Sequence, residues 1–361
     1  MYNFKEIKKL HLEISSNCQA SCPMCVRNHH GGIENPRLKV SDLDLNFFEH
    51  NIGSEFFKQL ENIMFCGNFG DPILNQELIP IIDYIVSCNK NIRIDLHTNG
   101  SARSTKWWAD LAKSLPKDHV VHFALDGLED THHLCRIGTS FSKIIENAKA
   151  FMANGGRARW VYIIFKHNEH QVELAKEMAK ELGFESFQEK ETSRFMNSPT
   201  FDVLDKLGKV THKLENPTNQ RLVVIDPNTI KNYKKLVKIA KVECQVRETK
   251  SIYIDALGYA WPCCWVGAVP YIHTYPSQII HDFQLDSHKS LFSVLDEFGG
   301  IEQLNVNKRS LFEIVDSVEW QNLWVQNYNN LNVCARTCGK FSEKILNQPD
   351  DQFMDLRELN E

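Results

Sequence analysis

The first half of the chain alternates short strand patterns with longer helical patterns. Lys9–Ser15 alternates apolar and polar residues as a strand does, and similar runs follow at Asn62–Cys66, Ile92–His97, Val120–Leu125, Trp160–Phe165 and Phe184–Gln188. Helical patterns lie between them, at Leu43–Leu60, Gln76–Ser87, Thr105–Ser114, Phe141–Asn154 and Glu169–Leu182. This alternation predicts an α/β fold with a parallel sheet, closed as a barrel or open. In either form the functional residues should lie at the carboxyl ends of the strands.

The size and charge of the chain limit its class of partner. Its 361 residues exceed one ordinary domain, so we expect one large domain and a smaller one. A net charge of −5, from 41 basic and 46 acidic residues, argues against a nucleic-acid partner. Met1–Ser15 is too charged for a signal peptide, and Leu78–Val86 is too short to span a bilayer. We therefore expect a cytoplasmic protein without a membrane partner, whose cysteines bind metal rather than form disulfides.

The strand–helix rhythm stops near residue 193, which divides the chain into regions. We assign residues 1–220 to a core domain, 221–345 to a small cysteine-rich α+β domain, and 346–361 to an acidic tail. Between the first two, Ile230–Lys241 is basic and amphipathic, which indicates a solvated helix face rather than a nucleic-acid site. The tail, Gln348–Glu361, is expected to be poorly ordered.

Three cysteines directly follow the first expected strand. Cys18, Cys22 and Cys25 have the spacing Cys-x3-Cys-x2-Cys. Three thiolates on one tight loop can hold three irons of a [4Fe–4S] cluster and leave the fourth iron without a protein ligand. An open metal position allows a substrate to bind there, whereas four protein ligands favour structure or plain electron transfer. The alternative is a zinc site completed by His29 or His30.

This triad resembles the signature of the radical S-adenosylmethionine superfamily, and the resemblance extends over the whole strand–helix half. It implies a partial (β/α)6 TIM-type barrel, which agrees with the expected strands. It also implies that the open iron binds the amino and carboxylate groups of S-adenosylmethionine. Reductive cleavage of this cosubstrate would release a 5′-deoxyadenosyl radical. A reducing donor such as flavodoxin or ferredoxin would supply the electron.

Two further motifs follow the second and third expected strands. Gly67-Asn68-Phe69-Gly70-Asp71-Pro72 resembles the family's Gly-Gly-Glu-Pro turn, in which backbone carbonyls hold the methionine ammonium. Asp71 replaces the usual Glu, and an ordinary strand–helix turn with a proline start is the alternative. Thr98-Asn99-Gly100 resembles the family's Thr-Asn-Gly, for which a simple Asn-Gly turn is the alternative. The resemblance implies that the cosubstrate is bound by Gly67, Gly70, Asp71, Pro72, Thr98 and Asn99.

The fourth expected strand ends in another motif of this family. Ala124-Leu125-Asp126-Gly127, followed by His132 and Arg136, resembles Ser-x-Asp-Gly…His…Arg. The resemblance implies that Asp126 belongs to the cosubstrate site and that Arg136 pairs with the methionine carboxylate, as a fixed cation can. Ala124 replaces the usual Ser, so one hydroxyl contact is absent. Arg136 as a surface residue is the alternative.

A second set of cysteines lies in the C-terminal part. Cys244-x13-Gly258-x4-Cys263 is followed by Cys334-x3-Cys338. Gly258 lies in a hairpin signal that would bring Cys244 near Cys263. The spacing resembles the shortened SPASM, or twitch, extension of radical S-adenosylmethionine enzymes, which implies one auxiliary iron–sulfur cluster, a [4Fe–4S] cluster, held by these four cysteines. A structural zinc site is the alternative.

Four further cysteines lie outside these two sets. Cys264 is a spare or an alternative ligand, and Cys66 and Cys88 are interpreted as small buried apolar residues. Cys135 lies beside the expected site, where an unreactive thiol is favoured over a redox-active one. The sequence thus favours a radical S-adenosylmethionine oxidoreductase or maturase. Its substrate would be a peptide or protein, with a small molecule as another option. The alternative from another class is a non-catalytic iron–sulfur or zinc protein in electron transfer or binding.

Overall fold

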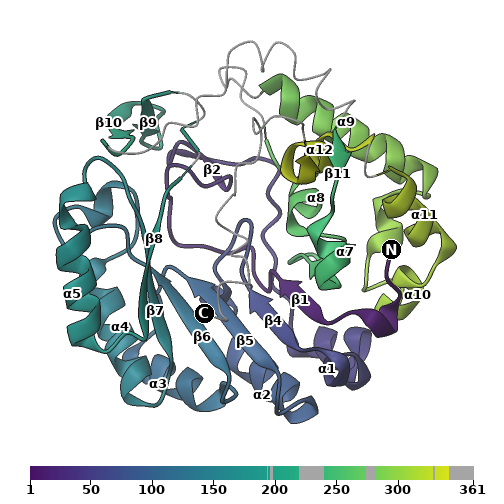
Figure 1. The fold of residues 1–361 in the computed structure, drawn as a ribbon, viewed down its shortest axis with the longest axis horizontal. Helices are drawn as coiled ribbons and strands as arrows, with labels where there is room; N and C mark the ends of the chain where they lie inside the picture. The colour runs from purple at the N-terminus through teal and green to yellow at the C-terminus, as the bar shows by residue number, and fades with distance from the viewer. Residues whose placement is uncertain (193, 196–197, 219–239, 274–280, 328–329, 341–361) are drawn as a thin grey trace.

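The computed structural model describes residues 1–192, 194–195, 198–218, 240–273, 281–327 and 330–340 (Figure 1). Residues 230–239 of the expected amphipathic segment lie outside these ranges. The expected boundary between residues 220 and 221 and the expected tail, Gln348–Glu361, lie outside them too.

The centre of the molecule is a parallel sheet whose strands follow the order of the chain. Its strands are β1 (Lys9–Leu12), β4 (Asn62–Phe65), β5 (Arg93–Thr98), β6 (His119–Ala124), β7 (Ala158–Ile163) and β8 (Ser186–Lys190). Each pairs in parallel with the next. The sheet curves, and its helices cover the outer side in Figure 1. This is the expected partial TIM-type barrel, and within the described residues no pairing joins β8 back to the other edge.

The covering helices are α1 (Ser54–Gln59), α2 (Leu78–Cys88), α3 (Thr105–Ser114), α4 (Phe141–Ala153) and α5 (Val172–Leu182). Serine side chains at positions 104 and 140 cap α3 and α4, and Gly183 ends α5 in the left-handed conformation. The expected continuous helix Leu43–Leu60 is wrong. A π-helical turn, η2 (Phe47–Ile52), ends at Gly53, whose φ of +83° breaks the helix before α1 begins.

The two faces of the sheet differ in polarity, because alternate residues of a strand point to opposite sides. On the helix-covered face, Phe123 packs against Trp108 and Phe151. On the concave face, His97 and His122 stack with ring centroids 4.1 Å apart. Other polar residues share this concave side by strand alternation, namely His11, Glu13, Asn62, Asp95, Gln188 and Lys190. Polar side chains therefore project into the interior of the partial barrel.

The C-terminal part adds strands to the same sheet. β12 (Ser251–Ile254) pairs in parallel with β1, and β13 (Ala260–Trp261) returns antiparallel to β12. The hairpin predicted around Gly258 is thus present, with a φ of +82° at that glycine. α7 (Gln245–Thr249) precedes this hairpin. After it come α8 (Cys264–Ala268), α9 (His281–Glu297), α10 (Leu311–Val315), α11 (Val318–Asn327) and α12 (Asn332–Cys338). These elements form the expected small cysteine-rich α+β region (Figure 1).

Short strand pairs complete the described structure. β2 (Asn28–His29) pairs with β3 (Ile33–Glu34), β9 (Thr200–Leu204) with β10 (Val210–Glu215), and β11 (Lys241–Val242) with β14 (Gly339–Lys340). The 3-10 turns are η1 (Phe4–Glu6), η3 (Pro72–Leu74), η4 (His132–Leu134), η5 (Glu169–Gln171) and η6 (Ile301–Leu304). Among the described residues, no helix has both the length and the apolar character needed to cross a membrane.

Candidate active site

The loop that carries the cysteine triad leaves the carboxyl end of β1 and is held by neighbouring segments. Ser21 N donates to Ile137 O at 2.8 Å, and Asn17 O accepts from Asp71 N at 2.8 Å. Within the loop, Cys25 N donates to Cys22 O at 3.0 Å. The backbone around the triad is therefore tied to the loops that follow β4 and β6.

The three thiols of the triad lie close enough to influence one another. Burial raises the pKa of Cys18, and Asp71, Cys22 and Cys25 raise it further. Burial also raises the pKa of Cys22, although the Arg136 guanidinium opposes this change. Thiols that resist ionisation through burial and mutual repulsion are stabilised as thiolates by bound cations. The donor set therefore fits an iron–sulfur cluster.

His29 and His30, the histidines considered as zinc ligands, lie near the β9–β10 hairpin. His30 Nδ1 lies 2.8 Å from Asp202 O, and its ring stacks on Phe201 with centroids 4.2 Å apart. The His29 ring lies 4.4 Å from that of His30. Both rings thus lie beside the β9–β10 hairpin. In the described parts of the chain, no three His, Cys, Asp or Glu side chains are arranged to hold a single metal ion.

The second and third motifs meet beside the triad through Asp71. Its carboxylate accepts hydrogen bonds from Thr98 Oγ1 at 2.8 Å and Asn99 N at 2.7 Å. Asn99 Nδ2 lies 3.8 Å from Cys18 Sγ, and Asn99 Oδ1 accepts from Gln19 Nε2 at 2.7 Å. Burial raises the pKa of Asp71 to about 6, although the hydrogen bonds from Thr98 and Asn99 lower it. Asp71 therefore fixes the two motifs to each other and brings Asn99 to the triad.

Gly67 and Gly70 are required in the turn because neighbouring atoms leave no room for a Cβ at either position. A Cβ on Gly70 would lie 1.9 Å from Ser15 O, and one on Gly67 would lie 2.8 Å from Glu13 Oε1. Pro72 then starts η3, and Asp71 caps it by accepting from Ile73 N at 3.2 Å. The turn is thus both a helix start and a tightly packed backbone cradle, so the two interpretations of this motif are compatible.

The fourth motif provides a fixed cation at the triad. Arg136 Nε donates to Asp126 Oδ2 at 2.6 Å, and Asp126 Oδ1 accepts from Ile163 N at 2.7 Å. The Arg136 side chain is 18% exposed, so it is not a surface residue. Burial favours its neutral form, but Asp126 and Cys22 hold its pKa above the ordinary value. His132 is buried, with Nε2 2.9 Å from Thr139 Oγ1.

Several buried polar residues support the site without having been identified from the sequence. Arg27 is buried and donates to Ser16 O and to Phe69 O, the latter at 3.2 Å. Glu13 lies on the concave face and accepts from the backbone of the glycine turn. The strand alternation of Lys9–Ser15 placed Glu13 on one face with His11, but it could not show which face was buried at the site.

The second cysteine set also comes together. Cys244 precedes α7, Cys263 precedes α8, and Cys334 and Cys338 lie one turn apart on α12. Burial raises the pKa of Cys334, and Cys263, Cys244 and Cys338 raise it further. Burial likewise raises the pKa of Cys263, and the nearby Cys244 and Cys338 raise it further. The four thiols therefore lie near one another, and a bound iron–sulfur cluster would relieve their mutual repulsion.

The remaining thiols occupy different surroundings. Cys264 is buried in the apolar core, and its charge would raise the pKa of Tyr253. Cys88 packs partly buried against the same core. Cys135 is buried, with Sγ 3.5 Å from Asp126 O. Cys66 differs from the expectation of an apolar environment, because Glu13 and Lys190 are among the charged groups near it.

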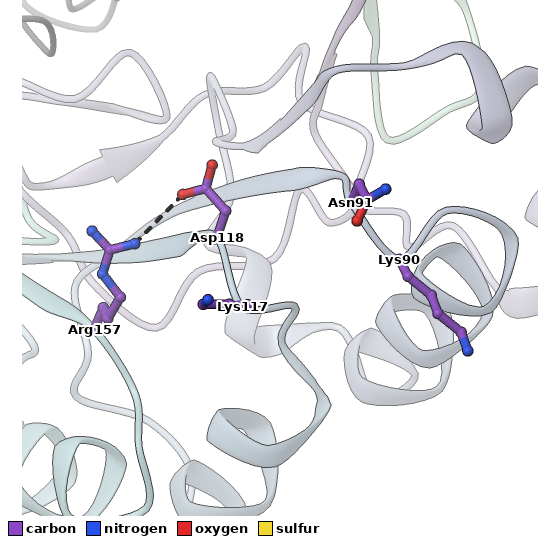
Figure 2. A pocket seen from close by; sticks show the side chains of 5 residues that line it. All are labelled: Lys90, Asn91, Lys117, Asp118 and Arg157. Atoms are coloured by element: carbon purple, nitrogen blue, oxygen red, sulfur yellow. Dashed lines mark hydrogen bonds and ion pairs between the residues drawn. The ribbon is translucent and has the colours of Figure 1, made fainter.

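A separate hollow lies at the opposite ends of the strands. Figure 2 shows its lining residues, Lys90, Asn91, Lys117, Asp118 and Arg157. Arg157 Nη1 lies 3.4 Å from Asp118 Oδ1. These residues precede β5, β6 and β7, whereas the triad and its motifs follow strands. The hollow is therefore not part of the candidate site.

Comparisons with known proteins agree with this geometry. The family model described as the radical SAM superfamily matches residues 12–182. A cofactor-modifying protein for tungsten-containing aldehyde ferredoxin oxidoreductase, from Pyrococcus furiosus, is 26% identical over 133 residues. That match covers 37% of this chain and 34% of the relative, so it spans about a third of the relative's length.

Solved structures share the fold. Streptococcus suis SuiB bound to precursor peptide SuiA matches with a TM-score of 0.53 and 12% identity, covering 95% of this chain and 77% of SuiB. Histidine-tagged anSMEcpe with bound AdoMet matches with a TM-score of 0.50 and 15% identity, covering 92% of this chain and 86% of anSMEcpe. The residues matched by the family model include the triad, the glycine turn, Asn99 and Arg136. Residues 12–182, the part of the chain that carries the candidate site, therefore match the model of the radical SAM superfamily.

Proposed function

We propose that this protein is an enzyme that cleaves S-adenosylmethionine reductively at a [4Fe–4S] cluster held by Cys18, Cys22 and Cys25. The observation that carries the proposal is the convergence of motifs on the triad. Asn99 Nδ2 lies 3.8 Å from Cys18 Sγ, and the charge of Arg136 acts on Cys22. When bound, the cluster would supply one electron that breaks the carbon–sulfur bond, giving methionine and a 5′-deoxyadenosyl radical that takes a hydrogen atom from the substrate.

The residues around the triad would bind and orient the cosubstrate. Carbonyl groups of the Gly67–Pro72 turn would accept from the methionine ammonium. Arg136 would pair with the methionine carboxylate, because Asp126 holds its Nε and orients the guanidinium beside Cys22. Asp71 would act indirectly, since its carboxylate already accepts from Thr98, Asn99 and Ile73.

We assign one auxiliary [4Fe–4S] cluster to Cys244, Cys263, Cys334 and Cys338. The proximity of four partly buried thiols supports this assignment. Four thiolates would enclose a cluster fully, which suits electron acceptance after hydrogen abstraction or a structural role. A zinc ion held by the same thiols is the competing assignment.

A peptide or protein is the proposed substrate. The concave face supports a polar substrate, because His97, His122 and Lys190 project to that side of the sheet. The likeness to SuiB, whose structure contains a precursor peptide, concerns the fold alone. A reducing protein such as flavodoxin or ferredoxin would be the electron donor.

The test is anaerobic reconstitution with iron and sulfide, followed by dithionite, S-adenosylmethionine and an assay for 5′-deoxyadenosine. The wild type should form it, and the variant with Cys18, Cys22 and Cys25 all changed to Ala should not. Cys88→Ala is the matched control, since Cys88 lies on α2 away from both cysteine sets. Undiminished cleavage in the triple variant would overturn the assignment. A loaded wild type that forms no 5′-deoxyadenosine would favour a non-catalytic iron–sulfur protein.

A further inference from the structure

We propose that Glu13, Asn68 and Tyr253 form a positioning bridge through which the second cysteine set controls cosubstrate binding at the glycine turn. The inference rests on the proposed function of that turn. The bridge residues come from β1's extension, the turn and β12, so they join three segments far apart in the sequence. All three are buried, with exposures of 2% for Glu13, 9% for Asn68 and 1% for Tyr253.

The first step is the contact between Glu13 and the turn. Glu13 Oε1 accepts from Phe69 N at 2.7 Å and from Gly70 N at 3.1 Å. In a planar trans peptide, the carbonyl points opposite to the N–H of the same unit. The carbonyls of Asn68 and Phe69 must therefore point away from Glu13. Glu13 thus sets the direction of the backbone carbonyls in the segment expected to bind the methionine ammonium.

The second step fixes Glu13 itself. Its other carboxylate oxygen accepts from the hydroxyl of Tyr253. Tyr253 lies on β12, where it is the register partner of His11 on β1. The ring is almost fully buried, so water cannot replace the hydroxyl. Removing this donor would leave a buried carboxylate oxygen short of one partner and free Glu13 to move.

The third step connects the turn to the cysteines of the second set. Asn68 Nδ2 donates to Tyr253 Oη at 3.1 Å and to Cys264 O at 3.0 Å. Cys264 directly follows Cys263 and begins α8. A shift of Cys263 on gaining or losing a bound cluster would move the neighbouring carbonyl. One side chain, that of Asn68, then carries this shift to the turn.

The bridge can transmit a change because it has no exposed or flexible member. Gly67 and Gly70 pack against Glu13 and Ser15 without room for a Cβ, so the turn cannot move independently. Buried hydrogen-bond networks of this kind hold one geometry while every member is satisfied. Loss of one hydrogen bond should therefore change the geometry of the others.

The experiment is a double-variant cycle on the reconstituted enzyme. Cys338→Ala removes a ligand of the second set, and Asn68→Ala removes the link to Cys264. For each variant we would measure the dissociation constant of S-adenosylmethionine and the hydrogen exchange of the peptide containing residues 67–72. Each single variant should weaken binding roughly tenfold, the effect of one lost buried hydrogen bond, and should speed exchange. The double variant should be no worse than either single variant, because both break the same path.

Two further variants make the cycle decisive. Tyr253→Phe keeps the ring and removes only the hydroxyl, so it tests the bridge if Asn68→Ala does not fold. Asn62→Ala is the matched control: Asn62 is also a buried asparagine of the β4 segment, but its Nδ2 donates to Asp95 Oδ2 at 2.7 Å at the far end of the strand. It should leave both cosubstrate binding and exchange at the turn unchanged.

The outcomes separate the bridge from the proposed function. Additive losses in the double variant, or unchanged binding and exchange in Asn68→Ala and Tyr253→Phe, would overturn the bridge while the function stands. A wild type that does not bind S-adenosylmethionine would overturn the function. The exchange rates at residues 67–72 would then still decide the bridge, since they do not depend on the cosubstrate.

Discussion

Arg136 Nε lies 2.6 Å from Asp126 Oδ2, and this ion pair places a buried guanidinium beside the thiol of Cys22. Asp126 is itself held by Ile163 N at the end of β7. The cation is thus oriented from two strands before any cosubstrate arrives. An oriented cation loses less freedom on binding an anion than a mobile surface residue does.

Arg136→Ala should weaken S-adenosylmethionine binding. Losing a charge-assisted hydrogen bond costs on the order of 1.5–3 kcal/mol, or roughly ten- to a hundredfold in affinity. Calorimetric titration of the reconstituted variant would measure this, with the cluster spectrum checked beforehand. Arg157→Ala is the matched control, because Arg157 pairs with Glu185 and Asp118 at the opposite ends of the strands. Equal dissociation constants for wild type and Arg136→Ala would place Arg136 outside the site.

Gly70→Ala should displace the glycine turn and impair cosubstrate binding by more than about tenfold. The new Cβ would lie 1.9 Å from Ser15 O. Its nearest neighbours are backbone atoms of Ser15 and Ser16, so no flexible side chain can move aside. Binding should be compared with that of Gly155→Ala, where a φ of +91° disfavours alanine but the new Cβ would have no neighbour within 4 Å. A Gly70→Ala enzyme with normal affinity would show that the turn does not contact the cosubstrate.

The two cysteine sets should load iron independently. Reconstituted wild type should hold about eight irons, and the variant without Cys18, Cys22 and Cys25 about four, as two four-iron clusters require. Cys338→Ala should lower the iron content and make the chain after Cys244 easier to cleave by protease, because metal ligation stabilises a small unit. Four irons plus one zinc in the wild type would refute the second cluster and leave a structural site.

Glu13 should be about half protonated near neutral pH, because burial raises its pKa to about 7. The hydrogen bond from Tyr253 lowers this pKa, so Tyr253→Phe should raise it further. Infrared spectroscopy across pH 5–9, a range of about two units on either side of that value, would follow the carboxyl band, with Glu13→Gln identifying it. A Glu13 band that stays ionised throughout this range would contradict the prediction.

Local patterns in the sequence determined much of the fold. The alternation of strand and helix periods predicted the order of β1, β4, β5, β6, β7 and β8, because parallel strands joined by helices follow the chain. The spacing of Cys18, Cys22 and Cys25 after β1 identified the triad, and Gly258 identified its hairpin. Each of these signals lies within a few residues or one strand–helix unit.

Other features depended on contacts that no local pattern encodes. Gly53 interrupts the helix expected across Leu43–Leu60, since one left-handed residue outweighs a continuous apolar period. The pairing of β12 with β1 was also not predicted, because the apolar pattern of a strand does not show which strand pairs with it.

The support of the site was decided by the tertiary structure alone. Tyr253 donates to Glu13 across 240 positions, and Asn68 donates to Cys264 across 196. Alternation in sequence shows which residues share a face of a strand, but burial of that face and the partner opposite it arise only when distant segments pack. The sequence therefore identified the residues proposed to bind the cluster and the cosubstrate. Packing of β12 and α8 against the glycine turn decided what holds them in place, because a buried polar group takes its partner from whatever segment lies next to it.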